Sequence, residues 1–157
     1  GHANDFLTVG GMGHASQIAL TIALQHPEQR IWCLDGDGAV LMHMGGMAII
    51  ANSEANNLVH VVLNNGAHDS VGGQPTVGLS IDIAKIASAM GYKQTYTVTS
   101  NTELTKVLNH IKEASGPILI NILVRKGNRP DLGRPTTTPI QNKQAFMAQI
   151  LKTTDEA

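Results

Sequence analysis

The sequence has little of several features that would place it in a specialised class of proteins. Its 157 residues include one cysteine, which excludes a disulfide framework. Only 15% of the residues are charged and the formal net charge is -1, so no basic field is available for nucleic acid. No apolar run approaches the roughly 20 residues of a membrane span, and no signal peptide is recognisable. These absences favour a cytoplasmic protein that acts on small molecules or protein partners.

Hydrophobic residues make up 42% of the sequence, which with a length of 157 residues suits one globular domain with a single core. Cys33 lies in the apolar run IWCL and is interpreted as a core thiol. The chain begins with GHANDF and lacks a methionine there, so we expect the natural protein to start further upstream. Residues 1–157 are treated as one domain, which includes a basic, proline- and glycine-rich tail at 125–139.

Short β-branched runs alternate with stretches of helical period, the pattern of an open, mainly parallel α/β sheet with helices on both faces. Gly91 is expected to end one helix, and Ser100 or Asn101 to cap the next. The predicted strands are 6–9, 30–34, 58–64, 93–98 and 118–124, and the predicted helices are 16–25, 41–52, 82–90, 102–114 and 142–152.

Glycine-rich corners fall at 10–16, 35–39 and 64–76, where ligands bind in such sheets. The first corner, with Asp35 after the next strand, leaves a dinucleotide-binding module open as an alternative, although Ser16 replaces the third glycine. A phosphate-binding P-loop is excluded because no Lys-Ser or Lys-Thr pair follows the glycines. An EF-hand loop is excluded because Ala39 stands where a ligand is required.

The second and third corners together predict a metal site. Asp37 offers a carboxylate, and Asn64 or Asn65 offers an amide oxygen, which are ligands that Mg²⁺ accepts. Because the two groups follow successive strands of a parallel sheet, they are expected to converge at one edge. Gly36 and Gly38 would let backbone N–H groups approach a diphosphate.

The GDG sequence, followed after 25 residues by NN, resembles the cofactor motif of thiamine diphosphate enzymes. The resemblance implies Mg²⁺ ligands at Asp37, Asn65 and the carbonyl of Ala67. It also implies that the carbonyl of Gly10 faces the aminopyrimidine and that Met12 is the wedge that bends the cofactor. The remaining cofactor-binding positions are then Gly13, Gly36, Gly38 and Ala39.

Longer stretches, including FLTVGGMGHASQIAL, NNGAHDSVGGQPT and RPDLGRPTTTP, look like the cofactor domain of the phosphonopyruvate decarboxylase family. Sulfopyruvate decarboxylase β subunits and acetolactate synthases are similar alternatives. The resemblance implies decarboxylation of phosphonopyruvate to phosphonoacetaldehyde, in a homo-oligomer whose pyrimidine-binding domain comes from another subunit. It also implies that this chain is a C-terminal fragment of a longer protein. The glutamate that related decarboxylases carry shortly after the asparagines is missing. The alternatives are His68, Asp69, Ser70 or no replacement at all, and we expect His68 and Asp69 to be the catalytic residues.

The basic tail offers candidates for binding the substrate. Arg129 and Arg134 lie in its proline- and glycine-rich stretch, and guanidinium groups suit the oxygens of a phosphonate. A solvated tail without a ligand is the other interpretation. We expect these two arginines to contact the phosphonate of a 2-oxo acid.

Overall fold

The computed structural model describes residues 4–155, which separate into two units. The larger unit comprises residues 13–127. The smaller unit comprises residues 4–12 together with 128–155. Among the described residues, no helix is both long and apolar enough to cross a membrane.

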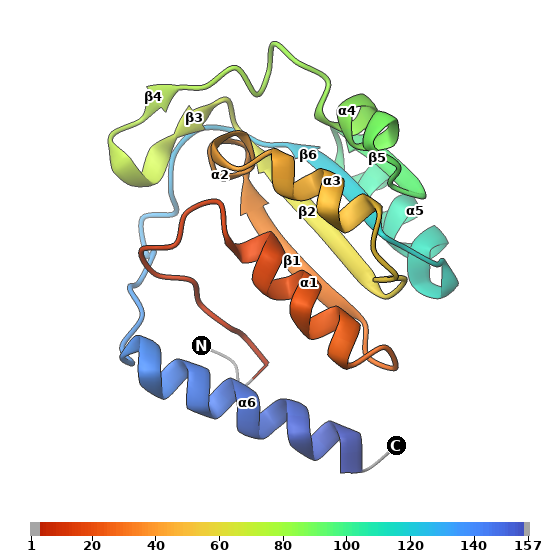
Figure 1. Ribbon diagram of the computed structural model, residues 1–157. Helices are drawn as coiled ribbons and strands as arrows, with labels where there is room; N and C mark the ends of the chain where they lie inside the picture. Colours follow the sequence, from red (N-terminus) through yellow and green to blue (C-terminus); the bar gives the residue numbers. More distant parts are fainter. Residues whose placement is uncertain (1–3, 156–157) are drawn as a thin grey trace. The chain divides into compact units, whose positions relative to one another are not determined.

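The larger unit is built on a parallel sheet of four strands (Figure 1). The order is β1 (Ile31–Gly36), β2 (Leu58–Asn64), β6 (Ile118–Leu123) and β5 (Gln94–Val98). Each neighbouring pair is parallel, so the carboxyl ends of the strands lie at one edge. The parallel sheet predicted from the sequence is confirmed, and four of the five predicted strands are present.

Helices cover both faces of this sheet, as predicted. On one face, α1 (Ala15–Gln25), α3 (Gly45–Ala51) and α4 (Ile83–Met90) pack on Leu58 and Val62 of β2. On the other, α5 (Asn101–His110) and the 3-10 turn η2 (Ile111–Glu113) pack on Val59 and Val61. Because side chains alternate along a strand, β2 is buried on both faces and needs an almost continuous apolar sequence.

The predicted helix caps are present. Gly91 ends α4 with a φ of 110°, a left-handed conformation that favours glycine. The Ser100 hydroxyl accepts a hydrogen bond from the Glu103 N–H at 3.3 Å, and the Glu103 carboxylate accepts one from the Thr99 N–H at 2.8 Å. The hydrogen bonds from the N–H and hydroxyl of Thr99 lower the pKa of Glu103, and the reciprocal arrangement fixes the start of α5.

The single helix predicted over 41–52 is wrong. The chain forms α2 (Asp37–Met42) and then α3, with His43 between them at a φ of -134°. Gly45 and Gly46 follow immediately, and glycine lowers the stability of a continuous helix. The first of the two helices, α2, begins at Asp37, four residues before the predicted start.

In the smaller unit, the predicted strand at 6–9 is not formed. Phe6 packs against Phe146 of α6 (Pro139–Asp155), with ring centroids 5.6 Å apart. The Leu7 N–H donates to the Asn142 side chain at 2.8 Å, so this segment uses a helix side chain in place of a strand neighbour. The helix α6 begins three residues before the predicted start, because Pro139 suits the first helical turn.

Candidate functional site

Asp37 lies where β1 ends and α2 begins, at the carboxyl edge of the sheet. Only 1% of its surface is exposed. The Thr76 hydroxyl donates a hydrogen bond to Oδ2 of Asp37. A buried carboxylate at this edge is a ligand type that a hard cation prefers.

Asn64, the last residue of β2, is fully buried beside Asp37. A Cβ atom built on Gly78 would lie 2.5 Å from Oδ2 of Asp37 and 2.8 Å from Oδ1 of Asn64. The side-chain oxygens of Asp37 and Asn64 therefore both lie close to the backbone of Gly78. The expected convergence of the two strand ends is present, and the asparagine that the structure brings to Asp37 is Asn64.

Asn65 is oriented by the loop that follows it. Its Oδ1 accepts a hydrogen bond from the Ala67 N–H at 3.0 Å, and its Nδ2 donates to Oδ2 of Asp69 at 2.7 Å. The Gly127 N–H donates to the same Asp69 oxygen at 2.8 Å. Asp69 thus ties the asparagine loop to the segment after β6.

A small hairpin that the sequence analysis did not predict carries His68. It pairs β3 (Ala67–His68) with β4 (Gln74–Pro75), around the 3-10 turn η1 (Asp69–Val71). The His68 ring lies against the backbone of Gly38, where a Cβ atom would collide with it. Two-residue strands give no periodic signal, which explains why the hairpin was missed.

Thr76 and Gly78 are site residues that the sequence analysis also missed. Both lie in or just beyond the third glycine corner, yet their role depends on contacts with Asp37 and Asn64, about 39 and 14 positions away. A pattern confined to neighbouring residues carries no information on such contacts.

The residues at this edge fit a diphosphate held by a hard cation. Asp37, Asn65 and Ala67 provide carboxylate, amide and carbonyl oxygens, the donor types that Mg²⁺ prefers. A Cβ atom on Gly36 would meet no atom within 4 Å, so its backbone borders open space. Gly36 can therefore present its backbone to a bulky anion, whereas the His68 ring lies against Gly38 and Ala39 is half-buried.

Four of the predicted site residues lie in the smaller unit. Gly10 has a φ of 75°, and Met12 is half-buried. Arg129 forms two hydrogen bonds with the Asp131 carboxylate, at 3.0 and 3.1 Å, while Arg134 is exposed. The other predicted site residues, including Gly13, lie in the larger unit.

A second polar cluster is buried under the sheet edge. Oδ2 of Asp35 lies 3.2 Å from Nε2 of His60 and 3.9 Å from Sγ of Cys33, while Nδ1 of His60 lies 3.2 Å from the Tyr92 hydroxyl. Burial, followed by the nearby Asp35 carboxylate, raises the pKa of Cys33 to about 12. The prediction that Cys33 is a core thiol is confirmed. Hydrogen bonds within the cluster account for all four polar side chains without an ion.

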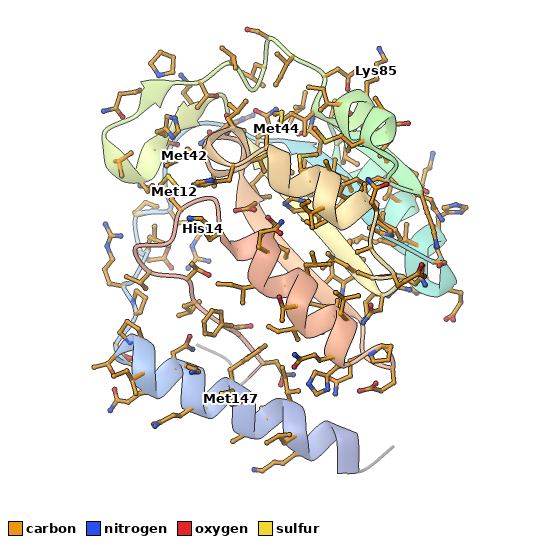
Figure 2. All side chains as sticks on the ribbon, in the orientation of Figure 1. Met12, His14, Met42, Met44, Lys85 and Met147 are labelled. Carbon is orange, nitrogen blue, oxygen red and sulfur yellow. The ribbon has the colours of Figure 1, made fainter. Side chains whose placement is uncertain are left out.

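The larger unit also has a depression of about 400 Å³, away from the predicted metal ligands. It lies between the start of α1, marked by His14, and the junction of α2 and α3, marked by Met42 and Met44 (Figure 2). The rings of His14 and His43 are 4.2 Å apart there. None of Asp37, Asn65 and Ala67 lines this depression, so it does not mark the predicted metal site.

Comparison with known proteins agrees with this geometry. Residues 2–122 match the family described as thiamine pyrophosphate enzyme, C-terminal TPP binding domain. The phosphonopyruvate decarboxylase of Streptomyces viridochromogenes is 39% identical over 145 residues, which cover 92% of this chain and 36% of that protein. That of Streptomyces hygroscopicus is 38% identical, over 90% of this chain and 35% of that protein.

Two further matches are less similar. The sulfopyruvate decarboxylase subunit beta of Methanothermobacter thermautotrophicus is 34% identical, over 78% of this chain and 63% of that protein. The X-ray structure of a Mycobacterium smegmatis protein assigned as a thiamin diphosphate-dependent enzyme aligns with a TM-score of 0.62 and 26% identity, over 75% of this chain and 23% of that chain.

This chain thus spans about a third of the length of the phosphonopyruvate decarboxylases that it matches. The family match includes both the GDG corner and the asparagine loop. It confirms the predicted thiamine diphosphate-binding fold and favours it over the dinucleotide-binding alternative. The chain belongs to the thiamine pyrophosphate enzymes and is their C-terminal domain, which binds thiamine diphosphate.

Proposed function

We propose that the protein containing this chain is a thiamine diphosphate-dependent decarboxylase of phosphonopyruvate, with phosphonoacetaldehyde and CO₂ as products. The observation that carries the proposal is the convergence of Asp37 and Asn64, which lie where β1 and β2 end, at the carboxyl edge of the sheet. The 39% identity to a phosphonopyruvate decarboxylase supports this choice of substrate.

In this proposal, Asp37, Asn65 and the carbonyl of Ala67 bind Mg²⁺, which neutralises the diphosphate. Backbone groups of Gly36, Gly38 and Ala39 approach the same diphosphate, since the backbone of Gly36 borders open space. The resemblance to thiamine diphosphate enzymes assigns Gly10 and Met12 to the aminopyrimidine of the cofactor. Bound thiamine diphosphate supplies an electron sink for the pair that remains when CO₂ leaves a 2-oxo acid.

His68 and Asp69 have different roles in this proposal. Asp69 already accepts hydrogen bonds from Asn65 and Gly127, so it fixes the loop that carries two metal ligands. His68 lies against Gly38, at the carboxyl edge of the sheet. In this proposal it is the group that moves a proton near the reacting carbon.

A complete site needs more than this chain. The resemblance assigns the glutamate that activates the cofactor to a pyrimidine-binding domain on another subunit of a homo-oligomer. The related sulfopyruvate decarboxylase subunits beta are named as subunits, which supports a two-part site. We expect residues 1–157 alone to release CO₂ much more slowly than the complete enzyme does, if at all.

The test is CO₂ release by the complete protein with thiamine diphosphate and Mg²⁺. The proposal expects the highest kcat/KM on phosphonopyruvate, with lower values on sulfopyruvate and pyruvate. A higher value on sulfopyruvate would favour the sulfopyruvate decarboxylase alternative. No turnover of any of the three substrates would contradict the proposed activity.

The substrate role of the arginines can be tested in the same assay. A guanidinium that contacts the phosphonate must affect phosphonopyruvate more than pyruvate. We therefore expect Arg134→Ala and Arg129→Ala to lower kcat/KM on phosphonopyruvate by about tenfold or more, with a smaller loss on pyruvate. Equal losses on both substrates would contradict the phosphonate contact. Arg129 would also have to exchange Asp131 for the substrate.

A further inference from the structure

The segment Thr76–Val77–Gly78, which follows β4, lies directly on the predicted metal corner. The Thr76 hydroxyl donates to Oδ2 of Asp37, and the Gly78 N–H donates to the Thr76 hydroxyl oxygen at 3.1 Å. Nδ2 of Asn64 donates to the Gly78 carbonyl at 2.8 Å. This three-residue segment thus contacts Asp37, just after β1, and Asn64, the last residue of β2.

Thr76 is itself held in place by the loop. Its backbone N–H donates to the carbonyl of Gly66 at 2.9 Å, next to the metal-binding asparagine of the proposed site. The hydroxyl is therefore fixed at the carboxylate through the backbone as well as through its own bond. Because the hydroxyl binds Oδ2, it restricts the rotation of the Asp37 carboxylate.

Gly78 contributes by its lack of a side chain. A Cβ atom there would approach Oδ2 of Asp37 to 2.5 Å, Cβ of Asp37 to 2.9 Å and Oδ1 of Asn64 to 2.8 Å. Buried side chains on two strand ends cannot both move aside without disturbing the corner. Glycine is thus required for space, since its backbone must lie against both groups.

We propose that Thr76 and Gly78 are positioning residues of the metal site. Thr76 holds the Asp37 carboxylate in its coordinating orientation, and Gly78 lets the segment approach closely enough to do so. The inference rests on the proposed function, because it takes Asp37 as a ligand of Mg²⁺. Groups that orient a metal ligand typically change metal affinity by about 10–100-fold when removed.

The experiment measures metal binding by the complete protein. Mn²⁺, a spectroscopic substitute for Mg²⁺, is titrated in the presence of thiamine diphosphate and followed by electron paramagnetic resonance. Calorimetry then gives the Mg²⁺ concentration for half-maximal thiamine diphosphate binding. The variants are Thr76→Val, which keeps the shape but lacks the hydroxyl, and Thr76→Ser, which keeps the hydroxyl. Thr105→Val is the control, because Thr105 is exposed and its hydroxyl donates to the Asn101 carbonyl within α5.

We expect Thr76→Val to raise the half-saturating metal concentration by about 10–100-fold, and Thr76→Ser to stay within about threefold of wild type. Thr105→Val should bind as wild type does. Gly78→Ala should weaken metal binding at least as much as Thr76→Val. A purely structural role would lower the melting temperature of Thr76→Val without this metal shift, or affect the serine and valine variants equally.

Two results would overturn the proposal. If Thr76→Val binds metal within threefold of wild type, the hydroxyl does not position Asp37. If Thr76→Ser is as weak as Thr76→Val, the effect is not carried by the hydroxyl; this comparison also decides the case when Gly78→Ala fails to fold. A wild-type protein that binds thiamine diphosphate without any dependence on metal would contradict the proposed function itself.

Discussion

Asp35 and Asp37 are two positions apart in the sequence, yet the structure uses them in opposite ways. Asp35, on β1, points into the core and contacts His60 and Cys33. Asp37, on the first turn of α2, lies at the edge of the sheet beside Asn64 and accepts a hydrogen bond from Thr76. Both carboxyl groups are buried, but only the second has neighbours that suit a metal ion.

The difference shows that burial alone does not mark a functional carboxylate. The partners of Asp35 are side chains that satisfy one another, which makes their cluster a closed network in the core. The partners of Asp37 come from loops at the strand ends, where ligands bind in parallel sheets. The first group should therefore act on folding stability, and the second on cofactor binding.

Removing His60 should give the largest stability effect. In His60→Leu, Asp35 loses its closest buried partner, so the free energy of unfolding should fall by about 3 kcal/mol. Urea denaturation of the complete protein measures the change, with His110→Leu, at an exposed histidine of α5, as the control. A loss below about 1 kcal/mol would mean that the network does not stabilise the core.

The Asp69→Asn substitution should lower the free energy of unfolding by less than His60→Leu does, and it should also weaken cofactor binding. Asp69→Asn replaces a charged acceptor of the Asn65 and Gly127 hydrogen bonds with a neutral one. Because the group is only half-buried, we expect a loss of about 1–2 kcal/mol in unfolding free energy, together with weaker Mg²⁺-dependent cofactor binding. Asp131→Asn, which weakens an exposed pair with Arg129, should change stability by less than about 0.5 kcal/mol. Equal effects in the two variants would contradict the anchoring role of Asp69.

Cys33 should give the smallest effect, visible only in alkaline solution. Its pKa rises from 9.0 to about 12 on folding, so the folded state holds the thiol proton more tightly than the unfolded state does. That stabilisation is complete below pH 9 and is lost as the pH rises toward 12. Between pH 9 and 10, the wild-type protein should lose about 1 kcal/mol more stability than Cys33→Ala. Parallel urea curves for the two proteins over this interval would exclude the buried thiol as the cause.

Much of this arrangement was predictable from the sequence. The apolar run of β2 and the caps at Gly91 and Ser100 determine local structure, so the sheet and most helices follow from them. The GDG and NN corners could be placed at one edge because strands of a parallel sheet end together. The sequence did not predict the break after Met42 or the contacts of Thr76, since both depend on packing between segments far apart in the chain.

The central claim is that Asp37 holds the metal while Asp35 supports the core. It is tested most directly by calorimetric titration of thiamine diphosphate, with and without Mg²⁺, into the complete wild-type protein, Asp37→Asn and Asp35→Asn. The account predicts that Asp37→Asn loses the Mg²⁺-dependent gain in affinity, by about 100-fold or more. Asp35→Asn should melt at a lower temperature but keep that gain within about threefold. If Asp37→Asn kept the full Mg²⁺ dependence, or both variants lost it equally, the claim would be contradicted.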